Sequence, residues 1–173
     1  MGEPTTPPPE DPPVADELTT LLAYVDYYRA VLARKIEGLT DEEARRAACP
    51  PSDLTLLGIV RHMADVERFW FRRSLVDEDA PPLFYGAAHP DGDDDGDFHA
   101  PPGATVAEAL AAYWNEIEVA NRNVVDFPLD DIERREQGTR SLRWILVHMV
   151  EEYARHAGHA DLLRQAIDGS TGD

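Results

Sequence analysis

Residues 141–169 read SLRWILVHMVEEYARHAGHADLLRQAIDG. Apolar residues recur along this stretch at intervals of three and four, which is the spacing of one face of an α-helix. Ser141 is a typical N-cap residue, and Gly169 stands where the end of a helix favours glycine. The stretch therefore predicts a helix that begins near residues 139–141 and ends near Asp168.

Glu152 and His156 lie four residues apart on the inward face of this predicted helix. At about 100° per residue, His156 falls about 40° from Glu152, and the apolar Ile145 and Leu163 fall about 20° from it. An acid and an imidazole at this spacing lean over the same turn and can share one metal ion. The pair is therefore a candidate for two ligands of a metal site.

A helix predicted over about residues 54–76 supplies a third candidate ligand. One face of this helix carries Ile59, His62, Val66, Phe69 and Arg73. His62 thus points the same way as apolar residues. Together His62, Glu152 and His156 form a set of two imidazoles and one carboxylate, the type used by catalytic zinc sites that keep one position open.

Glu152 also has a second interpretation. A carboxylate on an apolar face is costly unless it is paired, and Arg140, Arg143 or Arg155 could form a buried ion pair with it. Spacing alone leaves both interpretations open.

Two more histidines, His148 and His159, lie within about 40° of Glu152 on the same helix. Spacing alone does not exclude either of them as a ligand. We expect His148 to be a packing or gating residue. We expect His159 to contact a metal ligand and orient it without binding the metal itself.

Two further segments complete an all-α pattern. Helical periodicity covers about residues 15–37 and about residues 105–126, the second opening with a capping box of Thr105 and Glu108. A short extra helix is expected from Thr40. The tryptophans on these predicted helices are expected in the core more than on a substrate platform, namely Trp70, Trp114 and Trp144.

Residues 77–104 contain five prolines and an acidic run over residues 91–97, which predicts a long solvated crossover. The run matches the first half of a calcium loop, but its last ligand position would be Pro102, so no calcium site is predicted. A crossover of this length lets the helices before and after it run parallel. The sequence therefore predicts one four-helix bundle over residues 15–170, in up-down-down-up order, after a disordered proline-rich tail over residues 1–14.

Composition narrows the possible partners. The net charge is −18, from 34 acidic and 16 basic residues, which disfavours nucleic acid and anionic lipid surfaces. The chain has no apolar run long enough for a membrane span and no secretory signal, so we expect a cytoplasmic protein. Because Cys49 is the one cysteine, a metal must be held by imidazole and carboxylate.

Two segments resemble the DinB superfamily, and specifically its actinobacterial branch. They are LLGIVRHMADVERFW at residues 56–70 and SLRWILVHMVEEYARHAGHAD at residues 141–161. The resemblance implies a four-helix bundle whose metal is held by His62 and by two residues that map on Glu152 and His156. Glu152 stands where the superfamily usually has histidine. This difference is similar to the mycothiol-dependent maleylpyruvate isomerases, which use a His, Glu, His set.

The candidate ligands predict a divalent metal, zinc as the first choice and nickel as the second, because imidazole-rich sites accept either. The resemblance implies a low-molecular-weight thiol such as mycothiol. The expected activity is an S-transferase or a thiol-dependent isomerase that acts on small electrophiles. The alternatives are a metal-dependent hydrolase or a non-catalytic metal-binding bundle for stress response or ligand binding. The resemblance also favours a homodimer. The sequence identifies no general acid or base.

Overall fold

The computed structural model of the protein describes residues 12–172. Its elements are α1 (Glu17–Ile36), α2 (Asp41–Ala44), α3 (Leu56–Arg68), the π-helix η1 (Phe69–Ser74), the 3₁₀-helix η2 (Gly86–Ala88), α4 (Val106–Val124) and α5 (Leu142–Asp168). No β-strand occurs between residues 12 and 172, so the predicted all-α class is confirmed. None of the helices in that range is long and apolar enough to cross a membrane. The tail expected over residues 1–14 falls mostly on residues 1–11, outside the described part.

The long helices begin and end at the capping residues that the sequence provides. Backbone N–H groups in the first turns of α1, α3, α4 and α5 donate to the side chains of Asp16, Thr55, Thr105 and Ser141. These contacts satisfy donors that have no partner inside the helix. The predicted capping box of Thr105 and Glu108 is present, and Gly169 ends α5 in the left-handed conformation with a φ of 81°.

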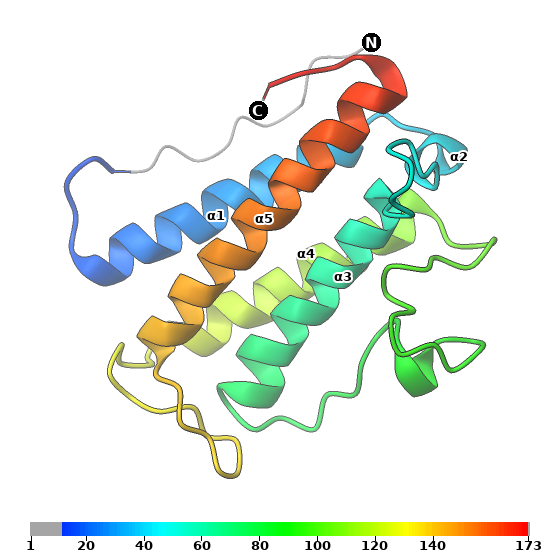
Figure 1. The fold of residues 1–173 in the computed structure, drawn as a ribbon. Helices are drawn as coiled ribbons and strands as arrows, with labels where there is room; N and C mark the ends of the chain where they lie inside the picture. The colour runs from blue at the N-terminus through cyan, green and yellow to red at the C-terminus, as the bar shows by residue number, and fades with distance from the viewer. Residues whose placement is uncertain (1–11, 173) are drawn as a thin grey trace.

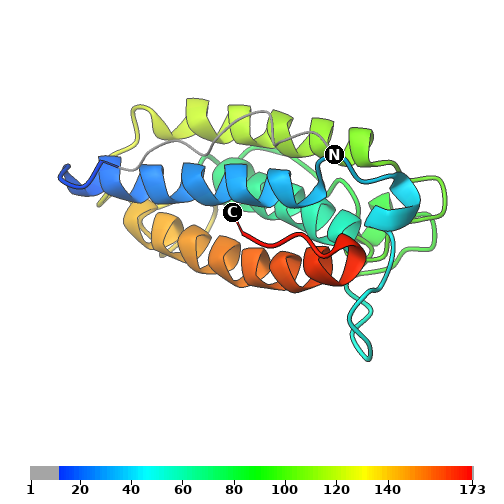
Figure 2. The ribbon, with the colours of Figure 1, turned by 90° about the horizontal axis from the view of Figure 1, so that it is seen from above.

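The four long helices pack as two pairs, α1 with α5 and α3 with α4. At the N-terminal ends of the first pair, Nε of Arg143 donates to Oε1 of Glu17 at 2.7 Å. At the C-terminal ends, Nη1 of Arg164 donates to the backbone oxygen of Lys35 at 3.0 Å. α1 and α5 therefore run in the same direction. Figures 1 and 2 show α3 and α4 running the opposite way, which is the up-down-down-up order.

A buried ion pair joins three helices inside the apolar core. Arg29 of α1 donates from Nε and Nη2 to the two carboxylate oxygens of Glu67 of α3, each at 2.7 Å. Tyr153 of α5 donates its hydroxyl to Oε1 of Glu67 at 2.5 Å. Arg29 is 2% exposed and Glu67 is 0% exposed. Such charge-assisted contacts restrict how the helices can rotate against one another.

The helix expected up to Val76 changes its type at Phe69. α3 passes there into the π-helix η1, in which the N–H of Leu75 donates to the oxygen of Trp70 at 2.9 Å. The wider π turn rotates the residues that follow it relative to a regular α-helix. Phe71 and Leu75 are therefore in the core, whereas Phe69 and Trp70 stay partly exposed.

The tryptophans of α4 and α5 do not lie in the core, which corrects the sequence expectation. Trp114 is 43% exposed and Trp144 is 44% exposed. On α4 the buried stripe passes through Tyr113 and Ile117, so Trp114 lies beside it at the edge of the helix. The buried polar residue of this helix is Glu116, whose carboxylate accepts hydrogen bonds from arginines of α3 and η1.

The crossover over residues 77–104 packs against α3, although its composition predicts a solvated connection. Arg61 donates from Nη2 and Nε to the backbone oxygens of Gly96 and Asp97, at 2.8 and 3.2 Å. The carboxylate of Asp65 accepts two backbone N–H groups of the crossover, at 2.7 and 3.0 Å. Two polar residues of α3 thus replace water as partners of the loop backbone, which composition cannot reveal.

Candidate metal centre

α5 places Glu152 and His156 on one turn, as their four-residue spacing predicts. Oε2 of Glu152 lies 3.5 Å from Nε2 of His156. The two side chains are 16% and 8% exposed, respectively. Both are therefore largely shielded from water on the inner side of the bundle.

His62 of α3 meets this pair from the neighbouring helix. The ring centroids of His62 and His156 are 4.7 Å apart. One potential ligand atom from each of His62, Glu152 and His156 lies within 4.8 Å of the others. The three residues are therefore close enough to be ligands of one ion, and two imidazoles with one carboxylate are a donor set that zinc sites use. We call these three residues the trio.

The protonation state of His156 fits a metal ligand. Burial is the largest cause that lowers the pKa of His156 to about 3, followed by the nearby His62 and His159. The imidazole is therefore neutral at neutral pH, as metal binding requires. Its Nδ1 is buried and has no hydrogen-bond partner among the described residues. A neutral, buried imidazole beside a carboxylate and a second imidazole is a donor set suited to a divalent metal.

The arginines that could compete for Glu152 do not bury an ion pair with it. Nη1 of Arg155 lies 3.9 Å from Oε1 of Glu152, and the Arg155 side chain is 54% exposed. Arg143 donates instead to Glu17, and Arg140 lies over the rings of two tryptophans. Among the described residues, none of these three arginines therefore forms a buried ion pair with Glu152, and its role as a metal ligand stays a prediction.

His148 lies at the edge of the trio, between two aromatic rings. Its ring stacks on Trp144 with centroids 5.0 Å apart and meets the edge of Trp70 at 4.8 Å. Nε2 of His148 is also 3.4 Å from Oε1 of Glu152. With Glu151 and Glu152, His148 makes a second group whose potential ligand atoms lie within 4.8 Å of one another. Aromatic packing agrees with the packing role expected for His148, and the gating role stays a prediction.

His159 packs against His156. The rings of His156 and His159 meet edge to face, with centroids 5.4 Å apart. Nδ1 of His159 is buried without a hydrogen-bond partner among the described residues. This position is compatible with the supporting role that the sequence suggests.

Sequence reasoning missed Asp97, which contacts the trio from the crossover. Oδ2 of Asp97 lies 2.8 Å from Nδ1 of His62. The next residue, Phe98, stacks on the His62 ring with centroids 4.1 Å apart. Gly58 permits this approach, because a Cβ there would lie 2.3 Å from the backbone oxygen of Phe98. Thirty-five residues separate His62 from Asp97, and no motif marks this carboxylate among its acidic neighbours.

Comparison with known protein families matches residues 20–169 to the family described as Mycothiol-S-transferase. The chain belongs to the mycothiol-S-transferase family. The match spans the trio and Asp97, and it confirms the resemblance to the DinB superfamily. A comparison with proteins of curated function finds no match.

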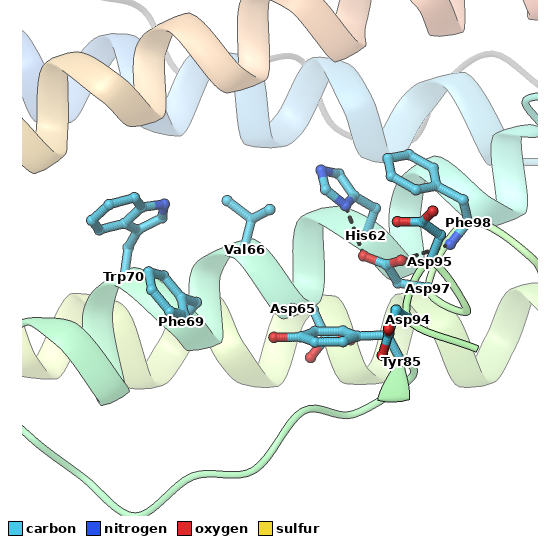
Figure 3. Close-up of a pocket in the computed structure, with 10 residues that line it drawn as sticks. All are labelled: His62, Asp65, Val66, Phe69, Trp70, Tyr85, Asp94, Asp95, Asp97 and Phe98. Carbon is cyan, nitrogen blue, oxygen red and sulfur yellow. Dashed lines mark hydrogen bonds and ion pairs between the residues drawn. The ribbon is translucent and has the colours of Figure 1, made fainter. Parts of the chain in front are cut away.

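In this mycothiol-S-transferase family member, a pocket of about 210 Å³ opens beside His62. Figure 3 shows it extending along α3, with Phe69 and Trp70 at one end and His62 and Phe98 at the other. Its wall is formed by His62, Asp65, Val66, Phe69, Trp70, Tyr85, Asp94, Asp95, Asp97 and Phe98. Aromatic and aliphatic side chains on this wall can hold a small organic molecule, whereas the carboxylates disfavour anions.

Proposed function

We propose that this protein is a metal-dependent mycothiol S-transferase that joins the thiol to small electrophiles. The observation that carries the proposal is the approach of the trio's ligand atoms to within 4.8 Å of one another, beside a pocket, in a chain of the mycothiol-S-transferase family. His62, Glu152 and His156 would hold the metal. Zinc is our first choice and nickel the second, because imidazole-rich sites accept either.

A bound divalent metal would supply Lewis acidity that lowers the pKa of a thiol, so that the thiolate exists at neutral pH. As metal ligands, the imidazoles of His62 and His156 would contribute lone pairs without adding positive charge. The carboxylate of Glu152 would offset part of the metal's charge, which makes the site harder and more anionic than a site of histidines alone.

The pocket residues would bind and orient the second substrate. Phe69 and Trp70 present aromatic surface at the end of the pocket away from His62. In the transfer itself, the sulfur forms a bond to an electrophilic carbon, the leaving group departs with the electrons of its bond, and the thiol proton passes to solvent. Because the pocket carries several carboxylates, neutral or cationic electrophiles should react faster than anionic ones.

Zinc-loaded protein, mycothiol and a neutral haloalkyl reagent provide the direct test. Thioether and halide should form in equal amounts, faster than without protein, and only when both thiol and metal are present. Loss of a substrate without any need for thiol would support the hydrolase alternative. Rearrangement of an unsaturated acid without thioether formation would support the isomerase. Metal binding without turnover of any of these substrates would overturn the proposal and leave a metal-binding bundle.

The homodimer expected from the resemblance stays a prediction. Light scattering at several protein concentrations should give twice the 19.3 kDa mass of the chain. A mass equal to one chain at every concentration would contradict it.

A further inference from the structure

The contact between Asp97 and His62 joins the crossover to the proposed metal centre. Oδ2 of Asp97 and Nδ1 of His62 lie 2.8 Å apart, and the two side chains are 10% and 19% exposed. Figure 3 shows the contact as a dashed line on the pocket side of α3. His62 thus contacts the crossover through Nδ1, and the contact leaves Nε2 available for another partner.

This contact selects the tautomer of the imidazole. An ionised carboxylate can only accept hydrogen bonds, so Nδ1 of His62 must carry the hydrogen. In the neutral ring, Nε2 then holds the lone pair that a metal needs. Histidine ligands in metalloproteins commonly donate their other N–H to a carboxylate, which fixes the ring and raises its basicity.

The carboxylate of Asp97 is itself held in place. Its Oδ1 accepts the N–H of Phe98 at 3.1 Å, and its backbone oxygen accepts a hydrogen bond from Arg61 of α3 at 3.2 Å. Phe98 also stacks on the His62 ring. The ring of His62 is therefore fixed by a hydrogen bond at its edge and by an aromatic face, both from the crossover.

We propose that Asp97 is the positioning residue that fixes the tautomer and orientation of His62 for metal binding. The inference deepens the proposed function and rests on it, because it requires that His62 is a ligand. It assigns a role in the site to the crossover, which contributes no member of the trio.

The test compares the zinc affinities of two variants that have the same change of charge, each measured by competition with a chelator. Asp97→Asn keeps the shape of the side chain but has an oxygen at only one of the two positions that contact His62 and Phe98. We expect it to weaken zinc binding by about 10- to 100-fold. Asp95→Asn is the matched control, because Asp95 is exposed and lines the same pocket. Its effect should be less than about twofold, as expected for a solvent-screened charge. Equal weakening by both variants would show a general loss of negative charge and overturn the positioning role.

Two spectroscopic measurements distinguish positioning from a general effect on folding. In metal-free wild-type protein, nitrogen NMR in mildly alkaline buffer should show the hydrogen of His62 on Nδ1, and Asp97→Asn should reduce the population of this tautomer. The visible absorption bands of bound cobalt should also change in Asp97→Asn and not in Asp95→Asn.

The outcomes separate the inference from the proposed function. If the wild-type protein binds zinc and Asp97→Asn binds it equally well, or if the hydrogen lies on Nε2 of His62, the inference is wrong while the proposed function stands. If the wild-type protein does not bind zinc at all, the proposed function itself is wrong, and the inference with it.

Discussion

Replacing Glu152 by glutamine removes a negative charge and leaves the size of the side chain almost unchanged. In the structure the carboxylate faces His156 at 3.5 Å and His148 at 3.4 Å. An amide is a much weaker metal ligand than a carboxylate and does not offset the charge of the ion. Glu152→Gln therefore tests whether this residue belongs to the metal centre.

The expected loss of stability follows from the surroundings of Glu152. The guanidinium within ion-pair distance is that of Arg155, at 3.9 Å on a side chain that is 54% exposed. An ion pair this exposed contributes at most about 1 kcal/mol. The free energy of unfolding of the metal-free protein should fall by no more than that. A buried arginine left without its partner would instead cost about 3–5 kcal/mol.

Zinc competition and urea denaturation of the metal-free protein measure the two effects separately. We expect zinc affinity to fall by more than the roughly 10- to 100-fold that loss of an outer hydrogen-bond partner causes, with a nearly unchanged unfolding midpoint. Unchanged zinc affinity together with a stability loss of several kcal/mol would refute the metal role of Glu152.

Three further predictions follow from other contacts. His62→Ala and His156→Ala should each lose zinc below one ion per chain in elemental analysis, and a variant that retained the full amount would contradict the trio. Glu67→Gln should lower the free energy of unfolding by about 3–5 kcal/mol, because Arg29 loses its buried charge partner and keeps only Asp26, whose side chain is 46% exposed; denaturant melts would measure this. Folding raises the pKa of Asp65 from 3.8 to about 6, chiefly through burial, so the native state holds this proton more tightly than the unfolded state. Wild-type stability should therefore fall relative to Asp65→Asn as pH rises from 3.8 to about 6, and a constant difference across that range would contradict the shift.

The regular helices were predictable because each rests on local signals. Thr105 with Glu108 and Gly169 are capping residues that can be recognised without tertiary information. The α-helical repeat places Glu152 and His156 on one turn of α5, whatever the helix packs against. Apolar periodicity indicates an inward His62 on α3, but spacing alone leaves His148 and His159 open as ligands. The resemblance to the DinB superfamily singled out the three side chains that meet in the structure, and metal binding by them stays a prediction.

The remaining features depend on interactions between distant parts of the chain. Asp97 reaches His62 because Arg61 binds the crossover backbone and Gly58 leaves room for it, a combination of residues that periodicity does not reveal. The change of α3 into a π-helix at Phe69 moves the residues after it to another face, which a fixed angle of about 100° per residue cannot anticipate. The exposure of Trp114 shows a further limit of prediction from the sequence. Tryptophan as a residue type favours burial, but position 114 lies beside the buried stripe of α4.

The π-helix carries Phe69 and Trp70, which line one end of the pocket, whereas no member of the trio lies on it. A π turn accommodates one more residue than an α turn, so removing one residue between Phe69 and Ser74 would restore a regular helix. Because His62 lies before this segment, such a deletion would leave its position on α3 in place and turn the aromatic side chains of the segment to a new direction. The number of residues in this single turn thus sets the shape of one end of the pocket, while His62, Glu152 and His156 keep their places on regular α-helix.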